Sequence, residues 1–146
     1  MNVVRLTFNY PLSVAFAVAG VGDSIVSVGP LPEGAVVSAV EVAAQAIGSD
    51  VVDALGVDVA FSRDKMADLA GFQSEATEFG GVVVLPAAGS CSDGGTFVPT
   101  FLSTLTFERL ISGRKRFVLV RLNSAGGNWT SVRGVVSVIV REGVDG

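Results

Sequence analysis

Valine-rich runs with the alternation of β-strands recur along this chain, and they constrain its fold more than any other feature. The sequence holds 27 valines and 18 glycines among 146 residues. Branched valine side chains suit the pleated strand, and glycine suits the reversals between strands. In residues 54–62, for example, Val57, Val59 and Phe61 occupy every second position. The pattern predicts an all-β chain with hardly any helix.

Turn residues divide the chain into about eight or nine strand-like runs. One short stretch, residues 63–70, has the spacing of a helical turn, since Met66, Leu69 and Ala70 share a face. The expected strands cover residues 2–8, 12–19, 25–28, 35–43, 54–62, 82–85, 97–107, 117–122 and 134–141. The sequence therefore predicts one domain over residues 1–146, a single β-sandwich of about eight strands and of jelly-roll type. An up-and-down barrel is the alternative.

The same alternation predicts which side chains fill the core. In residues 35–43 it places Val36, Ser38, Val40 and Val42 on one face and Val37 on the other. The set expected to be buried is Val40, Val42, Val57, Val59, Phe61, Val118, Val120, Val136 and Val138.

Residue composition excludes most catalytic sites. The chain has no histidine and one cysteine, Cys91. It therefore has no Ser-His-Asp triad, no imidazole base to activate Cys91, and no histidine metal site, and we interpret Cys91 as a free thiol. The spacing of Asp50, Asp53 and Asp58 does not match a calcium loop, which leaves only a weak surface cation site open there. We expect no enzymatic activity, no metal and no cofactor.

Charge is divided unevenly along the chain. Residues 1–108 hold three basic and twelve acidic side chains, a net charge of −9, whereas residues 109–146 hold seven basic and two acidic ones, a net charge of +5. Either the strands of the two halves interleave and the difference averages out, or the molecule has one acidic and one basic contact face. Nucleic-acid binding is not expected, because the only dense basic run, residues 114–116, lacks interleaved aromatics.

Residues 12–21 form an apolar run that we interpret as a buried strand rather than a signal peptide. The run follows Phe8, Tyr10 and Pro11 instead of a short charged segment, and its ten residues are too few for a membrane span. We therefore expect that the protein does not associate with membranes and that it is made in a reducing cytoplasm.

A turn and strand at residues 29–42 read GPLPEGAVVSAVEV, followed by ALGVD at residues 54–58 and RDKMADL at residues 63–69. This order resembles a pattern in small structural proteins of tailed-phage particles, where an L-P-x-G-A-x-V turn leads into a V-x-V-x-V strand. The resemblance covers about residues 29–70. It implies a virion subunit made in the host cytoplasm, a β-sandwich that decorates or cements a capsid, commonly as a trimer, without catalytic residues.

The low charge content and the mean hydropathy of +0.59 favour a chain whose apolar surface is covered by copies of itself or by a partner. We expect a symmetric oligomer, with a trimer favoured, bound to the major capsid protein or another virion subunit. Trp129 is the expected hydrophobic anchor, because the only tryptophan of the chain lies in a polar loop. The expected charged contacts are Arg114, Lys115, Arg116 and Arg133 on the basic side and Asp50, Asp53 and Asp58 on the acidic side.

Two other functions fit the same composition. The chain could itself form a jelly-roll shell, with lateral contacts on every side. It could also be a carbohydrate-binding sandwich module of a tail or cell-surface protein. The carbohydrate alternative requires several exposed tryptophan or tyrosine side chains, and the sequence has one of each.

Overall fold

The computed structural model describes residues 5–19, 22–47, 53–66, 68–85, 101–123 and 131–145. Within these ranges the chain forms eight strands and one short helix, so the all-β prediction is confirmed. The elements in chain order are β1 (Arg5–Ala19), β2 (Asp23–Val28), β3 (Val36–Ile47), β4 (Asp53–Ser62), α1 (Leu69–Gln73), β5 (Phe79–Leu85), β6 (Phe101–Leu110), β7 (Phe117–Asn123) and β8 (Ser131–Asp145).

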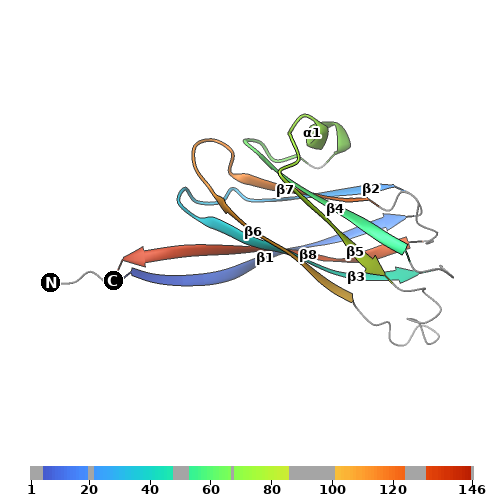
Figure 1. The fold of residues 1–146 in the computed structure, drawn as a ribbon. Coiled ribbons are helices and arrows are strands. Elements are labelled where there is room, and N and C mark those ends of the chain that lie inside the picture. Colours follow the sequence, from blue (N-terminus) through green and yellow to red (C-terminus); the bar gives the residue numbers. More distant parts are fainter. Residues whose placement is uncertain are drawn as a thin grey trace.

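The strands form two four-stranded antiparallel sheets (Figure 1). The first sheet has the order β1-β8-β3-β6, and the second sheet has the order β2-β7-β4-β5. Strand β1 pairs with β8, β2 with β7, β3 with β6, and β4 with β5. This nested pairing is that of one long hairpin rolled up into a sandwich, which is the jelly roll. The predicted sandwich is confirmed, and its strand pairing excludes the up-and-down barrel.

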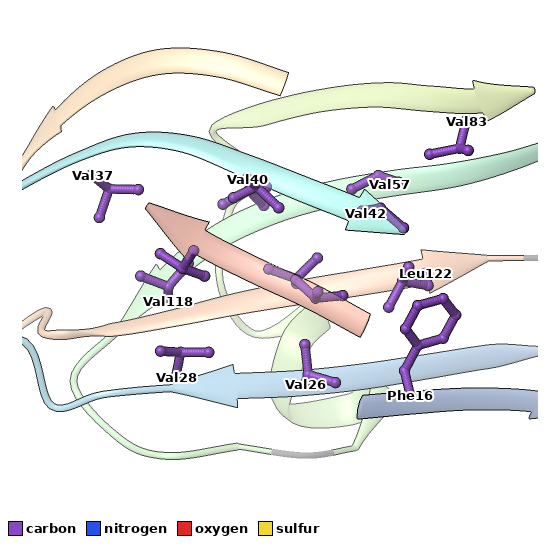
Figure 2. Packing of buried hydrophobic residues seen from close by; sticks show 14 of the residues in the cluster. Phe16, Val26, Val28, Val37, Val40, Val42, Val57, Val83, Val118 and Leu122 are labelled. Carbon is purple, nitrogen blue, oxygen red and sulfur yellow. The ribbon is translucent and has the colours of Figure 1, made fainter. Parts of the chain in front are cut away.

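The core lies between the two sheets and is built from the inward side chains of both. Figure 2 shows Phe16, Val40 and Val42 from the first sheet facing Val26 and Leu122 from the second. All nine side chains predicted to be buried are at most 3% exposed. The core prediction is therefore confirmed, and it depended only on strand periodicity.

The first strand is longer than the sequence predicts. Residues 2–8 and 12–19 were expected as two strands, but β1 runs without a break through Pro11, which lies opposite Ile139 of β8. Among the strands that the structure describes, β1 is at the edge of the first sheet and has β8 as its only neighbour there. Proline is tolerated in an edge strand because its missing N–H need not leave a gap in the ladder. The predicted break at Pro11 was therefore wrong.

A β-bulge at Ser38 changes which face of β3 is buried. The pairing of β3 with both neighbours shifts between Val37 and Ala39. Val37 is fully buried and shares the inward face with Val40, although strict alternation placed it on the other face. An extra residue in one strand reverses the alternation of inward and outward side chains on one side of it. The predicted inward face of β3 was therefore wrong for the residues before the bulge and correct for the residues that follow it.

The helix starts later than the predicted helical turn at residues 63–70. It begins after Asp68, whose Oδ1 accepts a hydrogen bond of 2.6 Å from the backbone N–H of Gly71. Phe72 is buried against Ala60 and Leu119 on the outer side of the second sheet. The chain thus covers part of that face with its own helix (Figure 1).

At one end of the molecule, β1 and β8 continue beyond β3 as a two-stranded ribbon (Figure 1). Strand β8 pairs with β1 as far as Asp145, whereas its pairing with β3 ends at Arg141. Near this ribbon the rings of Phe8 and Tyr10 lie 5.8 Å apart. Burial raises the pKa of Tyr10, and a hydrogen bond to the negatively charged Glu142 raises it further.

We expect Tyr10, the only tyrosine of the chain, to titrate above its ordinary pKa of 10.0. Because the pKa in the folded state is the higher one, the stabilisation from Tyr10 is complete below the ordinary pKa and is lost as the pH rises through the folded pKa. The ultraviolet absorbance of tyrosinate measures this titration directly. The substitution Glu142→Gln is expected to bring the pKa back toward the ordinary value, and a wild-type midpoint at or below 10.0 would contradict the contact.

Candidate assembly surfaces

The predicted basic run, residues 114–116, lies in the loop between β6 and β7. Lys115 Nζ is 3.3 Å from a carboxylate oxygen of Glu75, and Arg116 Nη2 is 3.2 Å from one of Glu33. Arg114 is exposed. Exposed pairs of this kind contribute about 0–1 kcal/mol. Two of the three bases are therefore partly neutralised by acids of the same chain.

The ion pairs favour one of the two interpretations of the uneven charge. Each pair found among the described residues joins a base of residues 109–146 to an acid of residues 1–108. The nested pairing explains this, because it lays the second half of the chain antiparallel along the first. The two halves interleave in these residues, and each base in these pairs lies next to an acid of the other half. The pairs are Arg109–Glu78, Lys115–Glu75, Arg116–Glu33, Arg121–Asp23, Arg121–Asp58 and Arg141–Glu108.

Asp58 belongs to a mixed polar cluster at the surface of the second sheet. Arg121 Nε lies 2.8 Å from Asp23 Oδ1, and Arg121 Nη1 lies 4.0 Å from Asp58 Oδ2. Asn123 donates a further hydrogen bond of 2.6 Å to the same oxygen of Asp23. Asp58 is thus next to a positive charge and does not form part of a purely acidic face.

The other predicted contact residues are placed only in part. Asp53 begins β4 opposite Leu85, and its side chain lies outside the described residues. Asp50 and Trp129 lie outside the described residues altogether. Their roles as an acidic contact and as a hydrophobic anchor stay predictions.

Arg133 is not close to the basic run. It lies on β8 opposite Gln45 of β3, and its Nε donates a hydrogen bond of 3.1 Å to the Gln45 side-chain oxygen. The loop that carries the basic run follows Ile111, whose N–H donates to the carbonyl oxygen of Ala35 at the other end of β3. Ten residues of strand, about 33 Å, separate Gln45 from Ala35. The structure therefore divides the predicted basic side between two distant places.

The outer face of the first sheet carries a patch of small and aliphatic side chains. We call Ala15, Ala17, Ala43, Val135 and Ile139 the small-residue patch. The patch spans the three adjacent strands β1, β8 and β3. Val135 is 39% exposed although it is a large aliphatic residue. Among the described residues, α1 lies over the second sheet only, so the two outer faces of the sandwich differ (Figure 1).

A shallow hollow of about 390 Å³ lies within this face. The small-residue patch supplies Ala15, Ala17, Ala43 and Val135 to its lining, and the other lining residues are Phe16, Gln45, Arg133 and Gly134. The prediction from the sequence missed this surface. Its signal was nevertheless present, because Ala15 and Ala17 alternate with buried Phe16 and Val18 in β1. A strand with a large inward face and a small outward face is suited to close approach by another surface.

No protein-family model matches the chain, and no curated protein matches it in sequence. The resemblance of residues 29–70 to tailed-phage proteins therefore has no support from sequence comparison. No helix in the described part of the chain is both long enough and apolar enough to cross a membrane.

Some solved structures are weakly similar to this chain. A chain of turnip yellow mosaic virus, from a structure of its empty head, aligns with a TM-score of 0.44 and 11% identity, covering 97% of this chain and 82% of its own. A chain of tomato aspermy virus aligns with a TM-score of 0.41 and 11% identity, covering 90% and 76%. A chain of naturally occurring empty cowpea mosaic virus particles aligns with a TM-score of 0.41 and 10% identity, covering 94% of this chain and 86% of its own. The jelly-roll assignment rests on the strand pairing and not on these scores.

Proposed function

We propose that this protein is a structural subunit of a virus particle, and specifically a decoration or cement subunit of a bacteriophage capsid. It acts as a single domain through protein–protein contacts, without enzymatic activity, metal or cofactor. Its partners are copies of itself, with a trimer favoured, and the major capsid protein or another virion subunit. The small-residue patch, which no described residue covers, carries this proposal, because a broad and shallow apolar sheet face fits another protein surface better than a small ligand.

The fold supports the proposal without deciding it. Double-sheet jelly rolls occur in viral capsid domains and in lectins, so the topology allows both functions. The L-P-x-G-A turn that resembles phage proteins is a structural element here. Gly34 has a φ of 89°, and its N–H donates a 2.7 Å hydrogen bond to the carbonyl oxygen of Ile111. The turn thereby joins the start of β3 to the end of β6.

The carbohydrate alternative finds less support on the surface. A sugar-binding face needs exposed aromatic rings, and among the described residues Phe8 is the only aromatic side chain with substantial exposure, at 45%. Tyr10 is engaged with Glu142. A shell-forming subunit stays the second candidate, because it needs the same apolar contacts but on more sides of the molecule.

Virus particles purified from the source of this gene test the proposal. Quantitative mass spectrometry measures the number of copies of this chain for each copy of the most abundant shell protein. A decoration subunit is expected in a fixed ratio to the shell protein, and mild guanidinium treatment is expected to release it while electron microscopy still shows intact shells. Particles that dissolve when the chain is released would identify a shell subunit instead. Absence of the chain from purified particles would contradict any virion role.

A further inference from the structure

Two opposite charges lie on either side of Ala43 and Val135, which form the centre of the small-residue patch. Glu41 is on β3 opposite Ser137, and Arg133 is on β8 opposite Gln45. The paired residues Ala43 and Val135 lie midway between them. The two charges lie about 14 Å apart, on a diagonal across the patch. This distance combines four residues along the strands, at about 3.3 Å each, with one strand spacing of about 4.8 Å.

Neither charge is compensated within the described part of the chain. Glu41 has no hydrogen-bond or ion-pair partner among those residues, and Arg133 uses only its Nε, for the bond to Gln45. Other bases of the sheet differ, because Arg141 Nη2 lies 3.3 Å from a carboxylate oxygen of Glu108. One negative and one positive charge therefore flank apolar surface, and no described residue neutralises either of them.

A second copy of the same chain supplies both missing partners. In this arrangement the first sheets of two copies stack with their outer faces together. A twofold axis lies between the two sheets and is parallel to them. The axis is perpendicular to the line from Glu41 to Arg133 and passes the midpoint of that line. This axis places Glu41 of each copy over Arg133 of the other, so both ion pairs form at once. Because the diagonal runs about 20° from the strands, the strands of the two copies cross at about 40°, near the roughly 30° typical of packed sheets.

We propose that the outer face of the first sheet is a twofold contact between two copies of this chain, with the small-residue patch at its centre and two Glu41–Arg133 ion pairs around it. Four strands, each about ten residues long, give a face of about 19 by 33 Å, on the order of 600 Å². With about 600 Å² on each copy the contact totals about 1,200 Å², which is at the lower end of the roughly 1,200–2,000 Å² that specific interfaces bury. Small side chains at the centre allow the sheets to approach to about 10 Å.

This contact uses the same small-residue patch that carries the proposed virion role. Its test concerns the purified protein alone, so the two proposals can fail separately. The contact requires an even number of copies. The protein is a dimer if the twofold contact is the only one, and a hexamer if a trimer also forms.

Charge reversal tests the contact. Glu41→Arg places like charges opposite each other at both ion pairs, and Arg133→Glu does the same with the opposite sign. Each single variant is expected to halve the mass of the assembly in light scattering, or to raise its dissociation constant at least about tenfold. The double variant Glu41→Arg with Arg133→Glu exchanges the two charges and is expected to restore association. Arg63→Glu, at an exposed base directly after β4, changes the net charge by the same amount as Arg133→Glu and is expected to have no effect.

Circular dichroism and thermal unfolding show whether each variant is folded. Rescue by the double variant supports the contact, because a change that merely damaged the fold would not be repaired by a second reversal. The proposal is overturned if the wild-type protein contains an odd number of copies. It is also overturned if the two folded single variants associate as the wild type does, or if the double variant associates no better than the single ones.

Discussion

Replacing Gly134 with alanine is expected to destabilise the protein by about 3 kcal/mol, at the upper end of the usual cost of overpacking. Gly134 lies on β8, in the interior of the first sheet between β1 and β3, opposite Phe16 and Ala44. A β-carbon at this position would overlap the carbonyl oxygen of Ala43 and lie 2.9 Å from Ala44 Cα. Both neighbours are backbone atoms, so no side-chain rotation relieves the clash and the strands themselves must move apart.

Gly56→Ala is the matched control for this prediction. Gly56 also lies within an interior strand, but a β-carbon there would meet its nearest atom, the carbonyl oxygen of Asn123, at 3.6 Å, an ordinary contact. Because alanine restricts the unfolded chain, this variant is expected to be neutral or more stable by up to about 1 kcal/mol. Urea unfolding of both variants, followed by circular dichroism, makes the comparison. Equal stability of the two variants would contradict the close approach of β3 and β8 at Gly134.

Truncating Phe61 to alanine is expected to cost about 4 kcal/mol, within the range for large buried aromatic side chains. Phe61 lies on β4, is 1% exposed, and belongs to the main core cluster between the sheets. The guanidinium carbon of Arg109 lies 4.7 Å from the centre of its ring, so the truncation also removes a cation–π contact. The cavity and the lost contact act in the same direction.

Phe8→Ala removes the same side chain from the surface. Phe8 is 45% exposed, so its loss is expected to cost about 1 kcal/mol or less. Urea unfolding measures both variants against the wild type. A cost below about 1 kcal/mol for Phe61→Ala would show that the ring is not enclosed as described. In that case the assignment of β4 as a central core strand would be wrong.

Features that depend on near neighbours in the chain were predictable from the sequence. The alternation of Val57, Val59 and Phe61 requires only that every second side chain point the same way, and this holds in any sheet. The errors arose where one residue altered that local rule. The bulge at Ser38 moved Val37 into the core. Pro11 stayed within β1 because the strand is at a sheet edge, and the position of a strand within a sheet is not a local property.

For the candidate contacts, the sequence identified the residue types but not the residues that lie next to them in the fold. Lys115 and Arg116 were expected to contact a partner protein, which stays a prediction, and the acids that they face in this chain, Glu75 and Glu33, are far away in sequence. Arg133 was grouped with them because it is basic, whereas the strand register places it beside Gln45. The small-residue patch was not predicted, because alanine has no functional group that would mark it as a contact residue in the sequence.

By itself, the sequence determined that this chain is all-β, that the alternating residues of its valine-rich strands are buried, and that its composition includes no histidine and one cysteine. Only the tertiary structure decided the nested pairing of strands, and with it the ion pairs between the two halves of the chain and the assembly of a patch from three strands. The physical reason is the separation along the chain of the residues that interact. Periodicity follows from the geometry of two or three successive residues, whereas the first strand meets the last across some 130 residues, as in the pairing of Tyr10 with Val140. Such a pairing is selected by the burial of the whole core, which no single segment encodes.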